Sequence, residues 1–148
     1  MAKLYNCGKL ELKTSTIPKA GFSVFTTNDI KAGEILEECQ YLQYPKYVRE
    51  FKTYRFWLDA KKRKYALVLG YGSMYNSDEK KQNAYWCVPS TPKIFTMRNV
   101  KITRKYLDCF TFYALKDIKK GEEIFHDYGE EYWDTREEKV KWQQKQKK

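Results

Sequence analysis

The sequence predicts a mainly β domain made of several short sheets, and two features of the chain lead to this prediction. Short segments alternate apolar and polar residues, as half-buried strands do, and "FSVFTT" at 22–27 is the clearest example. Polar turns that contain glycine separate these segments at short intervals. The length of 148 residues suits one compact domain, so we expect a single domain over residues 1–148.

A polar turn follows the strand predicted at 22–27. The sequence "NDIKAGE" places Gly33 where the chain must reverse, and glycine adopts a positive φ without steric cost. The next segment, "EILEE" at 34–38, is predicted to form a second strand.

The same turn occurs a second time, far along the chain. "DIKAGEI" at 29–35 nearly matches "DIKKGEEI" at 117–124. Two isolated copies do not make a solenoid, which needs several repeats at a fixed period. The match indicates instead that two strand pairs use one turn chemistry, with Gly33 and Gly121 permitting the turns.

The aromatic and basic segment 41–58 leaves its secondary structure open. Its middle part has aromatic residues at helical spacing, whereas "TYRFWL" at 53–58 is typical of a strand. The polar sequence "DAKKRK" then separates it from "KYALVLG" at 64–70, so a hairpin is predicted there. The apolar strand at 64–70 continues into glycine, serine and asparagine, a pattern that indicates a buried strand leading to a loop at a site.

The C-terminal half continues the strand pattern and then changes character. Strands are predicted within 90–107 and 109–118. From Glu130 on, the chain consists of helix formers, and Glu137 and Lys141 have the favourable order for an ion pair along a helix. We therefore expect a C-terminal helix and basic tail over about 130–148.

The charge and the aromatic content point to a class of partner. The formal net charge is +10, which favours acidic partners such as nucleic acid, nucleosome surfaces or anionic lipid, although a soluble basic protein without such a partner fits equally well. Aromatic residues make up 17% of the chain, so many of these rings must be half exposed or must line a groove.

The cysteines and the hydropathy predict an intracellular protein with reduced thiols. The four cysteines include no CxxC pair, and with a single histidine we expect no zinc cluster or other metal site. The N-terminus lacks the apolar run of a signal peptide, and no segment approaches the roughly 20 apolar residues of a membrane span.

Three segments, in this order and spacing, resemble the SET domain family of protein lysine methyltransferases. They are "IPKAGFSVFTTNDIKAGEILEE" at 17–38, "YGSMYNSDEKKQNAYW" at 71–86 and "GEEIFHDYGEEYW" at 121–133. The likeness covers about 17–133 and is closest to the minimal SET proteins of bacteria and large viruses. It implies a mainly β SET-domain fold with a knot-like C-terminal segment around Tyr128, and S-adenosylmethionine as the cofactor.

The resemblance implies a set of cofactor-binding residues. Gly21, Phe22 and Ser23 match the start of the family's G-x-G-V-F turn, whose backbone passes beside the cofactor, with serine in place of the second glycine. In the central segment Asn76 matches the asparagine that hydrogen-bonds the cofactor, and Asn83 matches the second asparagine of the motif. The residues expected to bind the cofactor are Gly21, Phe22, Ser23, Tyr75, Asn76, Ser77 and Trp133.

The central loop departs from the family pattern. The family histidine after the first asparagine is absent, and Ser77 stands at its place or the histidine is deleted. The proline of the motif is also missing, and the loop is about one residue longer. These differences bear on cofactor affinity and loop geometry.

The catalytic expectations centre on Tyr128. It matches the family tyrosine that faces the transferred methyl group, and His126 stands where the family usually has a phenylalanine or tyrosine that helps to determine the number of methyl groups. His126 is equally well explained as a strand histidine bonded to a neighbour. Tyr65 is a candidate for the lysine channel, as are Tyr71 and Tyr113, and each also fits the core.

The function implied is methylation of protein lysine residues with S-adenosylmethionine. Histone tails are the leading substrates if the source is a eukaryote or a virus infecting one, which implies a nuclear location in the cell or its host; otherwise the cytoplasm is expected. Contact with DNA or a nucleosome through the basic surface would explain the charge. Two alternatives stay open: an inactive SET-fold protein that binds chromatin, and a nucleic-acid-binding domain whose aromatic residues stack on bases. The oligomeric state is open.

Overall fold

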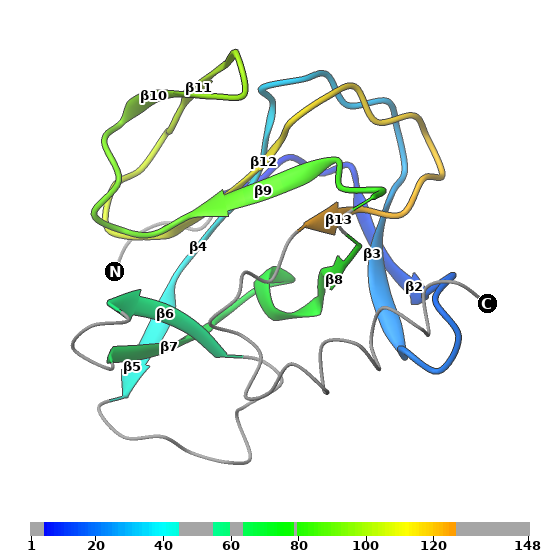
Figure 1. Cartoon of the computed structure of the whole chain (residues 1–148), viewed down its shortest axis with the longest axis horizontal. Coiled ribbons are helices and arrows are strands. Elements are labelled where there is room, and N and C mark those ends of the chain that lie inside the picture. Colours follow the sequence, from blue (N-terminus) through cyan, green and yellow to red (C-terminus); the bar gives the residue numbers. More distant parts are fainter. Residues whose placement is uncertain (1–4, 45–54, 60–63, 79, 127–148) are drawn as a thin grey trace.

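The computed structural model describes residues 5–44, 55–59, 64–78 and 80–126. In that part of the chain the secondary structure is almost entirely strand, in several small sheets, as the sequence predicts (Figure 1). The elements are β1 (Tyr5–Asn6), β2 (Leu10–Thr14), β3 (Phe22–Thr26), β4 (Ile35–Cys39), β5 (Tyr41–Tyr44), β6 (Arg55–Asp59), β7 (Lys64–Val68), the 3-10 turn η2 (Gly72–Met74), β8 (Asn76–Ser77), β9 (Ala84–Cys87), β10 (Ile94–Met97), β11 (Val100–Thr103), β12 (Phe110–Ala114) and β13 (Phe125–His126).

A four-stranded sheet in the order β1-β4-β12-β9 crosses the middle of the molecule. Strands β4 and β12 are buried along their whole length, because other elements cover both faces of this sheet. The predicted strands at 22–27 and 34–38 are confirmed as β3 and β4, with ends shifted by one residue. The β10–β11 hairpin lies above this sheet in the view of Figure 1.

The predicted hairpin between 53–58 and 64–70 is also confirmed. Strands β6 and β7 pair antiparallel with an irregularity between Trp57 and Asp59, and β5 adds to the other edge of β7. The part of 41–58 that showed helical spacing lies at 45–54, outside the described residues.

The main core lies between the central sheet and the β5-β7-β6 sheet. Its fully buried side chains include Val24, Leu36, Phe110 and Ile124, which come from four different strands or their ends. A second apolar cluster, around Ile102 and Tyr113, fills the space under the β10–β11 hairpin.

Two buried charged residues secure the loop between β11 and β12. The guanidinium of Arg104 donates hydrogen bonds to Thr111 Oγ1 at 3.0 Å and to the carbonyl of Cys109 at 2.7 Å. The Glu38 carboxylate accepts the backbone N–H groups of Lys105 and Tyr106, both at 2.6 Å. Because buried charges are costly unless they are hydrogen-bonded, these contacts hold the loop in one conformation.

The two matching turns pair with each other, which the sequence did not predict. Ile30 and Ile118 exchange two backbone hydrogen bonds of 2.8 Å across an antiparallel bridge. Asp29 Oδ1 accepts the N–H of Lys120 at 2.8 Å, and Asp117 Oδ1 accepts the N–H of Ala32 at 2.9 Å. Equivalent atoms of the two turns therefore make equivalent contacts, and the paired turns join the N-terminal and C-terminal halves of the domain.

The glycines of the two turns are equivalent in the same way. Gly33 donates its N–H to the carbonyl of Ala114 at 2.8 Å, and Gly121 donates to that of Thr26 at 2.9 Å. Both have a φ of 87°, as the prediction of positive φ requires.

The predicted C-terminal helix at about 130–148 and the knot-like segment around Tyr128 lie outside the described residues. Within the described part, none of the helical structure has the length and hydropathy that a membrane span needs.

The two turn glycines differ in their surroundings, which predicts unequal effects of alanine. A methyl group on Gly121 would meet no atom within 4 Å, whereas one on Gly33 would lie 3.0 Å from the carbonyl oxygen of Lys101. We expect Gly121→Ala to reduce the free energy of unfolding by about 1–2 kcal/mol through the positive φ alone. Gly33→Ala should cost more because steric overlap adds to that strain. Urea unfolding of both variants measures this, and equal losses would contradict it.

Candidate functional site

A short parallel pairing brings together segments that the sequence singled out separately. Strand β8 pairs with β13, so that Asn76 lies opposite Phe125 and Ser77 lies opposite His126. The N–H of Asp78 extends the pairing by donating to the carbonyl of His126 at 3.3 Å. The expected cofactor residues of the central segment therefore lie beside the strand that leads to Tyr128.

Asn83 holds this junction together with both its backbone and its side chain. Its Nδ2 donates to the carbonyl of Glu123 at 3.0 Å, and its Oδ1 accepts the N–H of Phe125 at 2.9 Å. Its backbone N–H donates to the carbonyl of Phe125, and its own carbonyl accepts the N–H of Leu115. The second asparagine of the motif is thus a structural residue that fixes β13 against the chain before β9.

A buried carboxylate holds the loop that precedes β3. Glu123 is 6% exposed and accepts hydrogen bonds from Ser15 Oγ at 2.7 Å, from Thr16 Oγ1 at 2.6 Å and from the Thr16 N–H at 2.8 Å. The N–H of Ser15 donates in turn to the carbonyl of Gly21. The position of the Gly21 turn is therefore tied to the strand segment that ends at His126.

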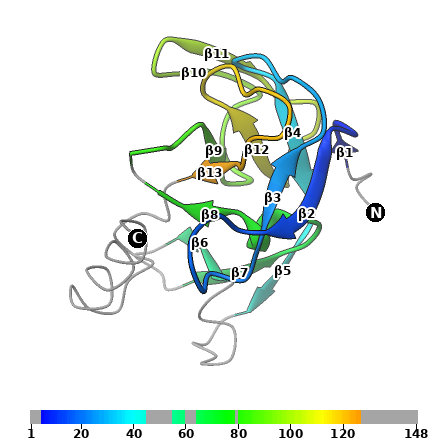
Figure 2. The same cartoon turned by 90° about the vertical axis from the view of Figure 1, so that its right-hand side faces the viewer.

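The start of β3 offers space and a polar group. Gly21 has a φ of 78°, and a Cβ there would meet no atom within 4 Å. Phe22 is 59% exposed, whereas Ser23 is fully buried and its Oγ has no hydrogen-bond partner among the described residues. Strand β3 packs against η2, and Figures 1 and 2 both show β3 beside β8. Three of the expected cofactor-binding residues therefore lie next to the β8–β13 junction.

His126 is buried among aromatic rings. Its ring is stacked with Phe56 at 6.4 Å between centroids, and it meets Tyr75 and Phe112 edge to face. Its Nε2 lies 3.2 Å from the carbonyl oxygen of Tyr75, and because a carbonyl only accepts, Nε2 carries the hydrogen in this contact. The histidine thus connects β13 to the segment just before Asn76.

Tyr75 joins a buried carboxylate behind the junction. Its hydroxyl donates to Glu37 Oε1 at 2.6 Å, and the Tyr71 N–H donates to Glu37 Oε2 at 3.2 Å. Burial raises the pKa of Glu37, and these hydrogen bonds to the charged form oppose the rise. Burial, followed by the nearby carboxylate, also raises the pKa of Tyr75, so its hydroxyl keeps its proton.

The three candidate channel tyrosines occupy different places. Tyr65 is 6% exposed and stacks on Tyr44 within the β5-β7-β6 sheet, at 5.5 Å between ring centroids. Tyr113 is fully buried in the second apolar cluster, as a core residue. Tyr71 is half-buried against the main core.

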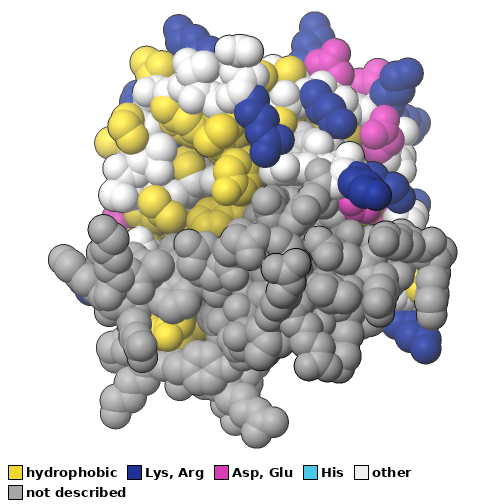
Figure 3. Space-filling view, in the orientation of Figure 1, with side chains coloured by type: hydrophobic (Ala, Val, Ile, Leu, Met, Phe, Trp, Pro, Cys, Tyr) yellow, Lys and Arg dark blue, Asp and Glu magenta, His cyan; other side chains and the backbone are white. Residues whose placement is uncertain are grey.

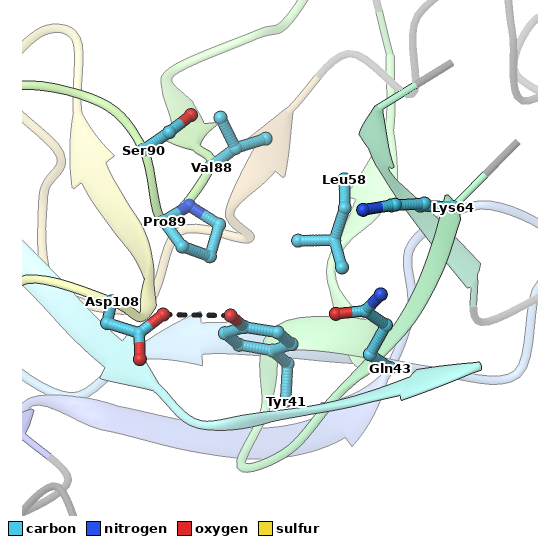
Figure 4. Close-up of a pocket in the computed structure, with 8 residues that line it drawn as sticks. All are labelled: Tyr41, Gln43, Leu58, Lys64, Val88, Pro89, Ser90 and Asp108. Carbon is cyan, nitrogen blue, oxygen red and sulfur yellow. Dashed lines mark hydrogen bonds between the residues drawn. The ribbon is translucent and has the colours of Figure 1, made fainter. Parts of the chain in front are cut away.

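Two of the surface grooves are lined by described residues. One, of about 410 Å³, lies between the β5-β7-β6 sheet and the segment after β9 (Figure 4). Tyr41 and Asp108 form its floor through a 2.9 Å hydrogen bond, and burial together with Asp108 raises the pKa of Tyr41 to about 12. None of the predicted site residues within the described part of the chain lines this groove.

The other groove, of about 500 Å³, adjoins the β8–β13 junction. Phe25, Asn83 and Phe125 contribute to its lining, and the exposed lysines Lys80 and Lys81 lie along it. Lys116, Glu122 and Glu123 complete the charged part of the lining. This groove therefore lies between the loop after β8 and the second of the paired turns.

The cysteines and the acidic residues of the described part offer no metal site. The cysteines Cys7, Cys39, Cys87 and Cys109 are free thiols. No group of three or more cysteine, histidine or acidic side chains in that part could hold a metal ion.

Tyr128 and Trp133, two of the predicted site residues, lie outside the described residues. Sequence reasoning also missed contributors to the site. Phe56 lies in an ambiguous segment, and only the tertiary structure places its ring on His126. Glu37 and Glu123 each belong to a pair of adjacent glutamates, at 37–38 and 122–123, and burial of these carboxylates has no signal in the sequence.

Comparison with known proteins supports the same segments. The sequence profile of the SET domain family matches residues 21–129. The crystal structure of a Plasmodium falciparum protein assigned as a histone methyltransferase is similar with a TM-score of 0.59 and 27% identity, covering 82% of this chain and 94% of that one. Among curated protein sequences, none matches the chain significantly.

Structures of a much larger assembly share the fold. A chain of the Chaetomium thermophilum polycomb repressive complex 2 is similar with a TM-score of 0.58 and 20% identity, covering 86% of this chain but only 16% of that one. The same complex with H3K27me3 and H3K27M gives a TM-score of 0.59 and 20% identity, over 82% and 14% of the two chains. At this identity the likeness shows the fold alone.

The Tyr75–Glu37 hydrogen bond predicts a pH-dependent effect of mutation. Tyr75→Phe removes a donor to a buried carboxylate, so we expect a loss of about 1–3 kcal/mol in the free energy of unfolding at neutral pH. The variant should raise the pKa of Glu37 further, because the charged carboxylate loses a hydrogen-bond donor. The loss in the free energy of unfolding should therefore be largest above that pKa and smaller in acid, where the carboxyl is protonated. Urea unfolding from pH 4 to pH 8 measures this, and a loss independent of pH would contradict it.

Proposed function

This chain belongs to the SET domain family, and on that premise we propose that it is a protein lysine methyltransferase that uses S-adenosylmethionine. The observation that carries the proposal is the β8–β13 pairing, which sets Asn76 beside the strand leading to Tyr128. In the family these two motif positions hold the cofactor and face the methyl group.

Several features of the junction support binding of this cofactor. The space beside Gly21 admits close approach of a ligand to the backbone. Asn76 is 6% exposed and Ser23 is fully buried, so a polar ligand would meet an amide and a hydroxyl in a sheltered place. The residues proposed to hold the cofactor are Gly21, Phe22, Ser23, Tyr75, Asn76, Ser77 and Trp133.

The chemistry assigns distinct tasks to the chain. The bound cofactor would supply a methyl group on a sulfonium. The lysine nitrogen would form a bond to the methyl carbon as the carbon–sulfur bond broke, and the electron pair of that bond would stay on sulfur. A lysine ammonium has no lone pair, and its free pKa is near 10.4, so the site must favour loss of a proton to water before transfer. Aromatic surroundings of low polarity favour the neutral amine, and the rings of Phe56, Tyr75 and Phe112 around His126 supply such surroundings in the described part.

Positioning is the main contribution proposed for Tyr128. In-line transfer needs no covalent enzyme intermediate, so the rate depends on holding amine and methyl carbon together. A tyrosine hydroxyl can make weak C–H···O contacts to a methyl group on positive sulfur. His126 and Tyr65 are proposed to shape the lysine site rather than to act as bases.

Histone tails are the proposed substrate class, in the nucleus of the cell or of its host. Similarity to a Plasmodium falciparum protein assigned as a histone methyltransferase, over nearly its whole chain, supports this choice.

The test of the proposed function is calorimetric titration of the protein with S-adenosylmethionine and S-adenosylhomocysteine, followed by radiolabelled methyl transfer to core histones. Saturable binding at one site and label on histone lysines are expected. Failure to bind either compound at millimolar concentration would contradict the proposal and favour an inactive SET-fold protein.

We also propose that the groove beside the junction contacts the DNA backbone. Lys80, Lys81 and Lys116 line it and are exposed. Figure 3 shows hydrophobic side chains gathered on the side of β9 and the β10–β11 hairpin, and lysine, arginine and acidic side chains on the side of the paired turns. Histone tails are basic, so a basic enzyme is not attracted to them directly. Binding to the DNA backbone would instead bring the enzyme close to the tail.

Tyr128→Phe should lower the rate of methyl transfer roughly tenfold, because two weak contacts of about 0.5–1 kcal/mol each would be lost in the transition state. Binding of S-adenosylhomocysteine should stay nearly unchanged. Single-turnover kinetics and calorimetry measure the two effects, with Tyr106→Phe as the control, since that tyrosine lies in the loop after β11. A loss of binding equal to the loss of rate would indicate a structural role.

Reversing the groove charges should weaken DNA binding and its salt dependence. The triple variant Lys80→Glu, Lys81→Glu and Lys116→Glu should reduce the slope of log affinity against log salt by about 3, because each phosphate contact contributes about 0.9. The control reverses Lys93, Lys101 and Lys105, which lie in or near the β10–β11 hairpin and change the net charge equally. Equal effects of the two variants in fluorescence anisotropy would show that net charge alone matters.

A further inference from the structure

The hydroxyl of Ser23 lacks the hydrogen bond that buried hydroxyls normally have. Ser23 is fully buried, and its Oγ finds no partner among the described residues. Two buried threonine hydroxyls are paired: Thr26 Oγ1, on the same strand, donates to the carbonyl of Lys119 at 2.8 Å, and Thr111 Oγ1 accepts from Arg104. The hydroxyl of Tyr113 also lacks a partner, but it lies in the second apolar cluster, away from the candidate site. Since most buried polar atoms have a partner, the exception at Ser23 calls for a ligand or another explanation.

The position of Ser23 on β3 places its buried side chain on the face of the strand opposite the main core. Successive side chains of a strand alternate between faces, so Ser23 shares a face with Phe25, whereas Val24 points the other way into the main core. Phe25 lines the groove beside the β8–β13 junction together with Asn83 and Phe125. The free hydroxyl therefore belongs to the side of β3 that borders the candidate site.

We propose that Ser23 Oγ donates a hydrogen bond to the charged amino-acid end of the bound cofactor. This inference rests on the proposed function. A buried hydroxyl gains most from a charged acceptor, because such hydrogen bonds are about twice as strong as neutral ones, and the carboxylate of the cofactor is its one anionic group. The family carries glycine here and offers only backbone, so the side-chain contact is a feature of this chain.

The contact also has a physical role in this sequence. The loop after Asn76 lacks the family histidine, and Ser77 stands at or near its place. An additional hydrogen bond from β3, on the other side of the junction, would offset part of the affinity lost there.

The experiment compares cofactor affinity with the stability of the free protein. Ser23→Ala should weaken binding of S-adenosylhomocysteine about tenfold in calorimetry, because a hydrogen bond to a charged group is lost. Binding of methylthioadenosine, which lacks the amino-acid end, should be unchanged. The melting temperature of the free protein should stay the same or rise, since no partner inside the protein loses its hydrogen bond.

Thr26→Val is the matched control, because Thr26 lies on the same strand as Ser23 and its buried hydroxyl has a partner, the carbonyl of Lys119. It should lower the melting temperature and leave S-adenosylhomocysteine affinity unchanged. Equal binding of S-adenosylhomocysteine by wild type and Ser23→Ala would overturn the inference while leaving the proposed function intact. If Ser23→Ala weakened the binding of S-adenosylhomocysteine and methylthioadenosine equally, the hydroxyl would not contact the amino-acid end, and the inference would be overturned. If the wild-type protein bound neither compound, the proposed function itself would fail, and the inference with it.

Discussion

The antiparallel contact between the two glycine turns is the constraint on which the arrangement of this domain depends. It joins the end of β3 and the start of β4 to the segment between β12 and β13, with two backbone hydrogen bonds between Ile30 and Ile118 at its centre. The aspartates Asp29 and Asp117 add one hydrogen bond each across the contact. Closing a long loop costs little more entropy than closing a moderate one, so a contact between distant segments can be maintained when it is this well paired.

The site follows from that contact through a small number of buried polar residues. Asn83 holds β13 in place with its amide, and Glu123 holds the loop that leads to Gly21. Each is hydrogen-bonded through its side chain to another segment of the chain. By contrast, Gly21 borders open space and Ser23 has a hydroxyl without a partner. Asn83 and Glu123, which are hydrogen-bonded within the protein, thus hold the segments of the site in place. Gly21 and Ser23, which are proposed to meet the ligand, lie close together at the start of β3.

Much of the secondary structure was predictable because it depends on local patterns. Alternation identified β3, the apolar run at 64–70 identified β7, and glycine identified two turns with φ of 87°. The SET motifs also identified the chain's family before the fold was known. What the patterns did not predict was that Ile30 and Ile118 pair with each other, since a repeated turn sequence carries no information about what it contacts.

The sequence by itself determined the family, the mainly β class and the residues that match the motifs, because each of these depends on residue type and spacing along the chain. Only the tertiary structure decided that His126 lies among Phe56, Tyr75 and Phe112, that Glu37 is buried against Tyr75, and that Asn83 is a structural residue. These are contacts between segments distant in sequence, and their burial and hydrogen bonding depend on the packing of several sheets at once. For that reason the chemical environment of the site could not be predicted from the motifs that mark it.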